Sequence, residues 1–165
     1  MQGLLPPLND HNLPWMDTIH PIVVHFVIAM ALVAFLYDLV GVLARRPALF
    51  EVSFWNLLFA TAAIFVAIIF GQVEAGLASP YGASREILDI HTTIGWSLAG
   101  VLSLLTGWRY VIRGRDPEIL PARFLGAGAV VSALIIVQMV LGDRLIWTYG
   151  LHTVKVVAAM REGLI

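Results

Sequence analysis

The sequence predicts an all-α integral membrane protein, an up-and-down four-transmembrane-helix bundle with a short interfacial C-terminal helix. Hydrophobic residues make up 59% of the 165 residues and charged residues only 13%, and the mean hydropathy is +0.86, all far from the values of soluble domains. The apolar residues gather in four segments, each near the ~20 residues that cross about 30 Å of hydrocarbon. Stretches such as AAIFVAIIF also lack a polar face.

The four segments divide the chain into a lead, a membrane domain and a tail. We expect residues 1–20 to form an N-terminal extracytoplasmic lead, residues 21–149 the four-helix transmembrane domain and residues 150–165 an interfacial tail. The lead lacks the positive start and the cleavage site of a secretory signal, so the first apolar segment is expected to be a retained span. The predicted spans are Pro21 to Val42, Phe54 to Ala75, Leu88 to Val111 and Phe124 to Trp147.

The first span is predicted to begin at Pro21, because proline suits the first position of a helix. His20 then precedes the helix, where we expect it to cap the helix or to meet solvent. Near the other end of this span, Asp38 is expected at the interface, close to Arg45 and Arg46. Burying its carboxylate in hydrocarbon would cost about 2.5–3.5 kcal/mol.

The second and third spans each carry a stripe of small and polar residues, and the stripe on the second span ends at Glu74. Small residues let a neighbouring backbone or a flat ligand approach closely. The fourth span ends at Trp147, an aromatic residue of the kind enriched at membrane interfaces. On the third span, steps of four lead from His91 to Gly95, Ala99, Ser103 and Gly107.

Arginine is concentrated on the side of the connectors between spans one and two and between spans three and four. With four spans both termini share the opposite side, and the lead carries no Lys or Arg. The positive-inside rule therefore places both termini outside the cytoplasm, in a bacterial inner membrane or a thylakoid membrane. The arginines on the predicted cytoplasmic side are Arg45, Arg46, Arg109, Arg113, Arg115 and Arg123.

Composition also excludes several kinds of function. The chain has no cysteine, which excludes disulfides, thiolate metal sites, iron–sulfur clusters and covalently attached c-type haem. Its net charge is near zero and it has no basic run, so nucleic acid is not an expected partner. Catalytic triads, phosphate-binding loops and zinc-protease patterns are missing, so the sequence does not point to an enzyme.

All five histidines fall on or near the predicted outer side. At about 1.5 Å of rise per residue, His25 lies about 6 Å below Pro21 and His91 about 4.5 Å below Leu88. The first and third spans run parallel, so these two rings are expected at a similar depth, facing each other across the bundle.

This placement predicts a single b-type haem ligated by two histidines, with the small-residue stripe leaving room for the macrocycle. A carboxylate is expected to orient a ring nitrogen, and an arginine to meet the propionates. Electrons would pass to or from a membrane quinone, an extracytoplasmic electron carrier or a membrane redox complex. The predicted cofactor-binding residues are His25, His91, Gly95, Ala99, Glu74 and Arg144.

Other interpretations of the same residues stay open. Metal binding by His25, His91 and His20 is one, and proton handling with Glu74 is another. The two rings can also be plain inter-helix hydrogen-bonding groups. In a further alternative the chain is a cofactor-free accessory or assembly subunit of a respiratory or photosynthetic complex. The pattern assigns no role to His152 or Asp143.

The motifs HPIVVHF, LDIHTTIGW and GDRLIWTYGLHTV resemble a bacterial family of membrane proteins catalogued as domain of unknown function 2231. The resemblance runs from His20 to Val154. The chain departs from the family pattern at Val27, where the family has a second proline, and at Asp143 and Trp147, where it has glycine and tyrosine. The resemblance implies four transmembrane helices and no particular activity. The haem hypothesis rests on the placement of residues, together with a looser likeness of the chain to four-helix b-type cytochromes.

Overall fold

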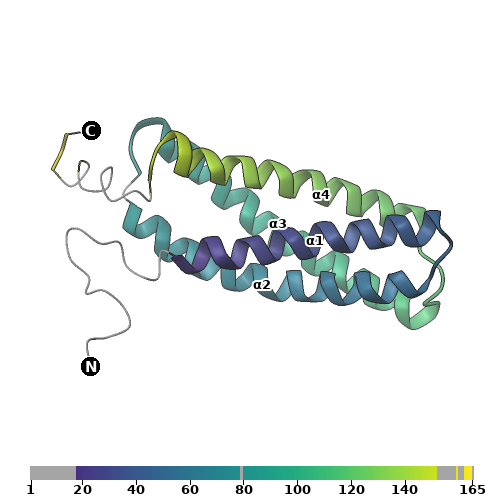
Figure 1. The fold of residues 1–165 in the computed structure, drawn as a ribbon. Helices are drawn as coiled ribbons and strands as arrows, with labels where there is room; N and C mark the ends of the chain where they lie inside the picture. The colour runs from purple at the N-terminus through teal and green to yellow at the C-terminus, as the bar shows by residue number, and fades with distance from the viewer. Residues whose placement is uncertain (1–17, 79, 152–158, 160–161, 165) are drawn as a thin grey trace, which may run out of the picture.

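Four long helices form one elongated up-and-down bundle in the computed structural model, which describes residues 18–78, 80–151, 159 and 162–164 (Figure 1). Within those residues the predicted all-helical class is confirmed. Most of the predicted lead and most of the interfacial tail lie outside the described residues. The helices are α1 (Ile19–Leu43), α2 (Ala48–Ala78), α3 (Gly82–Arg115) and α4 (Ala122–Asp143), which continues into a π-helical turn, η2 (Arg144–Thr148).

The helices are longer than the apolar segments that predict them. α3 begins at Gly82, six residues before the predicted Leu88, because the backbone N–H of Tyr81 donates to the Ser84 hydroxyl and satisfies the start of the helix. Apolarity marks the part of a helix that crosses lipid, whereas capping decides where the helix ends.

α1 also begins earlier than predicted, at Ile19, so the expectation that His20 precedes the helix is wrong. Pro21 is the third helical residue. Proline is tolerated throughout the first turn, because the N–H that it lacks has no partner there. The two extra residues bring His20 into the helix and fix the direction of its side chain.

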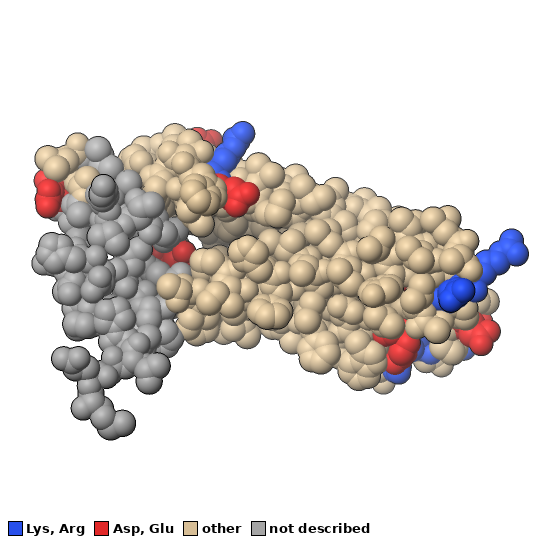
Figure 2. Space-filling view, in the orientation of Figure 1, with Lys and Arg blue, Asp and Glu red and all other residues tan. Residues whose placement is uncertain are grey.

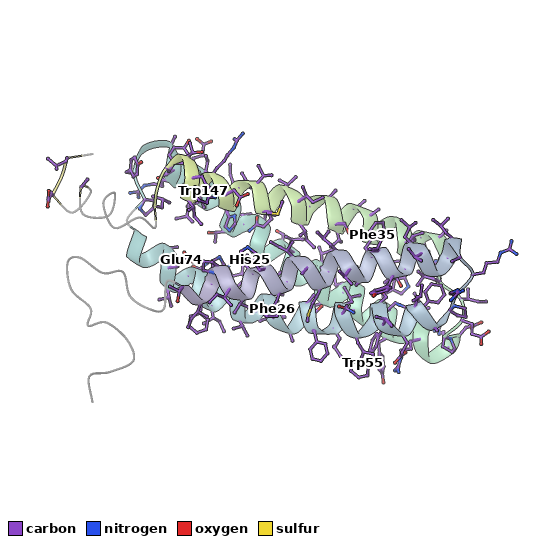
Figure 3. All side chains as sticks on the ribbon, in the orientation of Figure 1. His25, Phe26, Phe35, Trp55, Glu74 and Trp147 are labelled. Atoms are coloured by element: carbon purple, nitrogen blue, oxygen red, sulfur yellow. The ribbon has the colours of Figure 1, made fainter. Side chains whose placement is uncertain are left out.

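The surface of the bundle between its two ends is apolar. Leu104 is 76% exposed, Val130 70% and Phe59 56%. Figure 2 shows a tan middle with charged side chains gathered toward both ends, and Figure 3 shows Phe26 and Trp55 projecting from the bundle. All four helices are long and apolar enough to cross a membrane. Large apolar side chains exposed in this way are favourable in contact with lipid and unfavourable in contact with water.

We name the two ends of the bundle after their buried polar groups. The histidine end is where α1 and α3 begin, with His20 and His91. The arginine end is the opposite end, where Arg109 of α3 is only 1% exposed and donates to the Phe50 carbonyl at 2.9 Å. Asp38 lies 3.9 Å from the Arg109 guanidinium and is 4% exposed. Asp38 is therefore buried inside the bundle, where Arg109 supplies its charge partner, and its position at the depth of the membrane interface stays a prediction.

Candidate ligand-binding cavity

A cavity of about 380 Å³ lies at the histidine end, and all four helices contribute to its walls. Most of its lining is aliphatic, including Val27, Ile64, Leu98 and Ile135. Figure 2 shows the surface hollowed at this end, between α1 and α4. A cavity of this size and composition has the dimensions of sites that hold small organic ligands and cofactors.

His20 forms the polar part of one wall. Its Nδ1 lies 2.7 Å from the Ala67 carbonyl of α2. A carbonyl oxygen can only accept, so Nδ1 carries the proton and the neutral ring keeps its lone pair on Nε2. Nε2 lies 4.0 Å from the carboxylate of Glu74, which is 4% exposed. At that distance the two groups form no hydrogen bond, and they form an ion pair only when Nε2 is protonated as well.

His20 also lies directly against Gly71 of α2. A methyl group added at Gly71 would be 2.9 Å from Cε1 and 3.0 Å from Nδ1 of the ring. Such distances are shorter than van der Waals contact, so only glycine leaves room for the imidazole at this place. Helix packing therefore holds the ring at the cavity wall.

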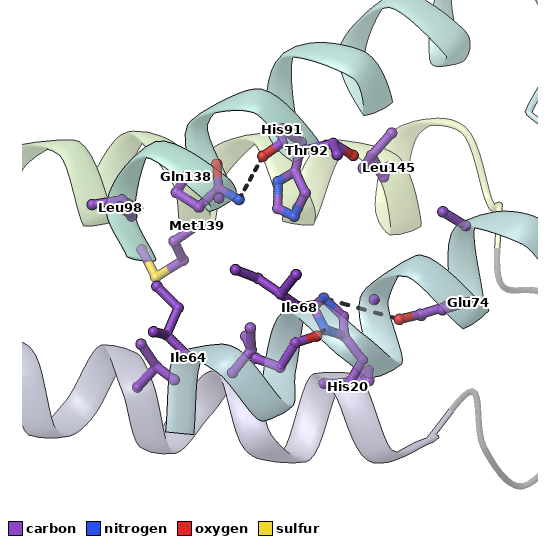
Figure 4. A pocket seen from close by; sticks show the side chains of 18 of the residues that line it. His20, Ile64, Ile68, Glu74, His91, Thr92, Leu98, Gln138, Met139 and Leu145 are labelled. Carbon is purple, nitrogen blue, oxygen red and sulfur yellow. Dashed lines mark hydrogen bonds and ion pairs between the residues drawn. The ribbon is translucent and has the colours of Figure 1, made fainter. Parts of the chain in front are cut away.

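His91 of α3 forms the polar part of the opposite wall, as Figure 4 shows. Its Nδ1 is buried and has no hydrogen-bond partner among the described residues. The side-chain amide of Gln138 on α4 donates to the His91 backbone carbonyl at 2.9 Å. A methyl group added at Gly142 would be 3.2 Å from Cε1 of His91. The ring therefore packs against a glycine of α4, and its Nδ1 is buried without a partner among the described residues.

His25 lines the same cavity from α1, but its environment differs from that of His20. Its side chain is exposed, and its Nδ1 donates to the Pro21 carbonyl one turn earlier in the same helix. Figure 3 places it at the histidine end. Three of the histidines singled out in the sequence, His20, His25 and His91, thus line one cavity.

The other predicted site residues divide into two groups. Gly95 and Glu74 line the cavity. Ala99 is 1% exposed and packs in the core below it, while Arg144 is exposed on η2 and is not among the lining residues. Among the described residues no group of three or more His, Asp or Glu side chains could hold a metal ion. His152 lies outside the described residues.

The sequence does not single out Gln138 or Gly142 as site residues, and Gly71 stands out only as a member of the small-residue stripe of the second span. Gln138 carries a usable signal, because a lone amide inside an apolar span rarely lacks a partner within the bundle. The glycines carry no signal on their own, since glycine is frequent in transmembrane helices. Their part in the site follows only from the rings that lie on them.

Comparison with known proteins supports the membrane assignment. Residues 16–155 match the sequence pattern of a family described as "Predicted membrane protein (DUF2231)". No curated protein and no solved structure gives a significant match to the chain. The match includes all of α1 to α4 and both walls of the cavity.

Proposed function

The chain belongs to the DUF2231 family of predicted membrane proteins, and on that premise we propose that it binds one b-type haem in the cavity and transfers electrons. One observation carries the proposal. Two parallel helices, α1 and α3, bring imidazoles to opposite walls of a single, mostly apolar cavity within the membrane bundle. That is the environment in which bis-histidine haem sites are built, between facing helices.

The residues present suit a haem in three respects. The aliphatic lining suits the porphyrin, and the cavity volume lies within the usual range for cofactor sites. His91 offers an imidazole that lines the cavity from the opposite wall. On the α1 wall, both His20 and His25 donate Nδ1–H to a main-chain carbonyl, which leaves Nε2 as the basic nitrogen. Ligating histidines are commonly oriented by such a bond from the other ring nitrogen.

The haem iron would supply one-electron chemistry, and the protein would supply its ligands, its apolar surroundings and its position. Arg144 follows Asp143, a residue of the cavity lining, so a propionate emerging at this end would find a cation nearby. The cavity lies near one end of the bundle, which suits exchange with a carrier or quinone on that side and not conduction across the whole bilayer.

We extend the proposal to location. Arg45, Arg46 and Arg113 all lie at the arginine end. The positive-inside rule then puts that end in the cytoplasm and the cavity on the extracytoplasmic side of a bacterial inner membrane or a thylakoid membrane.

Haem binding is tested by the absorption spectrum of protein purified in mild detergent from haem-replete cells. We expect a Soret band and, after reduction, a sharp α-band, both lost in His91→Ala. Asn56→Ala serves as control, because it removes a polar side chain of α2 that does not line the cavity, and should keep both bands. A colourless wild-type preparation overturns the proposal.

The contact between His20 and Glu74 favours a second candidate, a quinone site. An imidazole beside a carboxylate can exchange protons with a quinone oxygen, and the cavity is open to the side. Here organic extraction of the purified protein should recover about one quinone per chain, and Glu74→Gln should lower that yield. Absence of quinone from protein purified in native lipid rules this candidate out.

A further inference from the structure

The two helical hairpins, α1 with α2 and α3 with α4, carry the same histidine–glycine contact. In each hairpin an Ile-His pair stands in the first helix, at Ile19–His20 and at Ile90–His91. In each, the glycine that supports the ring follows 51 positions later, as Gly71 and as Gly142. The two contacts are therefore separated by a constant 71 positions.

The same separation of 71 positions relates the buried faces of the hairpins. Every buried residue of α1 has a buried counterpart on α3, including Asp38, whose counterpart is its own charge partner Arg109. In α2 and α4 the pairs Ala60 with Val131 and Ile64 with Ile135 are buried alike. The buried pairs of α1 and α3 are Val27 with Leu98, Ala31 with Leu102, Ala34 with Leu105, Asp38 with Arg109 and Gly41 with Ile112.

The buried faces of the two hairpins are thus equivalent and face one another. This indicates two repeats related by a pseudo-two-fold axis along the bundle. A ligand centred on such an axis meets equivalent atoms from both repeats. His20 and His91 are equivalent in this sense, whereas the counterpart of His25 is Trp96. Both His20 and His91 lie on a helix glycine, and Figure 4 shows them on opposite walls.

From this symmetry we propose that His20 and His91 are the two residues that would ligate the haem, and that His25 is not a ligand. The pairing rests on the haem function proposed above. Gly71 and Gly142 then act as positioning residues, because each holds its imidazole at the wall. Glu74 breaks the symmetry, since its counterpart Leu145 is apolar, so the carboxylate that lies 4.0 Å from His20 has no equivalent at that position of the second repeat.

The test compares single alanine variants of the three histidines in the purified protein. We expect His20→Ala and His91→Ala each to lose the low-spin, six-coordinate spectrum and to bind haem about tenfold or more weakly. His25→Ala should keep the low-spin spectrum. Added imidazole should restore that spectrum in His20→Ala and His91→Ala, which distinguishes a missing ligand from a misfolded protein.

The glycines give a second measurement with a matched control. Gly71→Ala and Gly142→Ala should displace the rings and shift the electron paramagnetic resonance g-values of the oxidised haem. Gly100→Ala should not, because an added methyl at Gly100 meets nothing within 4 Å among the described residues.

A wrong pair of ligands and a wrong haem function give different results in these variants. If the wild-type protein binds haem but His25→Ala loses the low-spin spectrum while His20→Ala keeps it, the His20–His91 pairing is wrong and haem binding stands. If wild-type protein and all variants are colourless, the haem function falls, and the pairing falls with it.

Discussion

The arginine end of the bundle is filled by protein, whereas the histidine end contains a cavity. Arg109 lies between the rings of Phe50 and Phe124, at 5.5 and 5.7 Å from their centroids, and the void beside Asp38 measures only about 20 Å³. At the histidine end the rings of His20 and His91 border about 380 Å³ of open space. Buried polar groups that meet only protein suggest a structural role, while those facing a cavity are available to a ligand.

The largest effect is expected at the arginine end. Asp38→Leu leaves the buried Arg109 guanidinium without its carboxylate, which should lower the free energy of unfolding by about 3–5 kcal/mol. The measurement is unfolding by SDS in mixed micelles, followed by circular dichroism.

A second variant separates charge from packing at this pair. The double variant Asp38→Leu/Arg109→Leu removes both charges and should recover much of the lost stability. Glu51→Gln, which breaks the exposed pair between Glu51 and Arg113, should stay close to wild type. If the double variant were less stable than Asp38→Leu, the pair would not be the source of the effect.

The next largest effect is expected for a glycine in tight contact, and the two ends of the bundle each offer one, Gly41 and Gly71. A methyl added at Gly41 would lie 2.5 Å from the ring of the buried Phe50, which has no space to retreat. Gly41→Ala should therefore destabilise the protein by about 1–3 kcal/mol, as overpacking does. Gly71→Ala should destabilise it less, because the His20 ring can turn into the cavity.

The same unfolding assay compares the two variants, with Gly100→Ala as the reference for a glycine in open space. Equal losses for Gly41→Ala and Gly71→Ala would mean that the cavity gives the His20 ring no freedom. The contrast between a filled and an open end would then be wrong.

Much of the fold follows from the sequence because lipid imposes a simple rule on span length and polarity. Four apolar segments suffice to predict four helices, and the rise per residue predicts a similar depth for His25 and His91. It does not suffice to tell which side of a helix faces inward. The two residues that α1 gains before Pro21 place His20 toward α2, and no apolar periodicity signals that rotation.

The repeat was equally hidden in the sequence. At a separation of 71 positions, identity is confined to a few places such as Ile64 with Ile135 and Gly71 with Gly142. Elsewhere one aliphatic residue replaces another, as at Val27 and Leu98, because either fills a membrane core equally well. Burial reveals the correspondence because it reports the face of the helix and not the identity of the side chain.

The smallest effect is expected for Gln138→Leu at the histidine end. The His91 carbonyl that accepts from this amide also has the ordinary helical partner four residues on, so losing the amide leaves it bonded. The Gln138 Oε1 is itself buried without a partner among the described residues, and the substitution removes that unsatisfied oxygen. The two changes oppose each other, and the unfolding free energy should stay within about 0.6 kcal/mol of wild type. A loss several times larger would show that Gln138 stabilises the histidine end as Asp38 stabilises the arginine end. The cavity would then be a consequence of helix packing and not a ligand site.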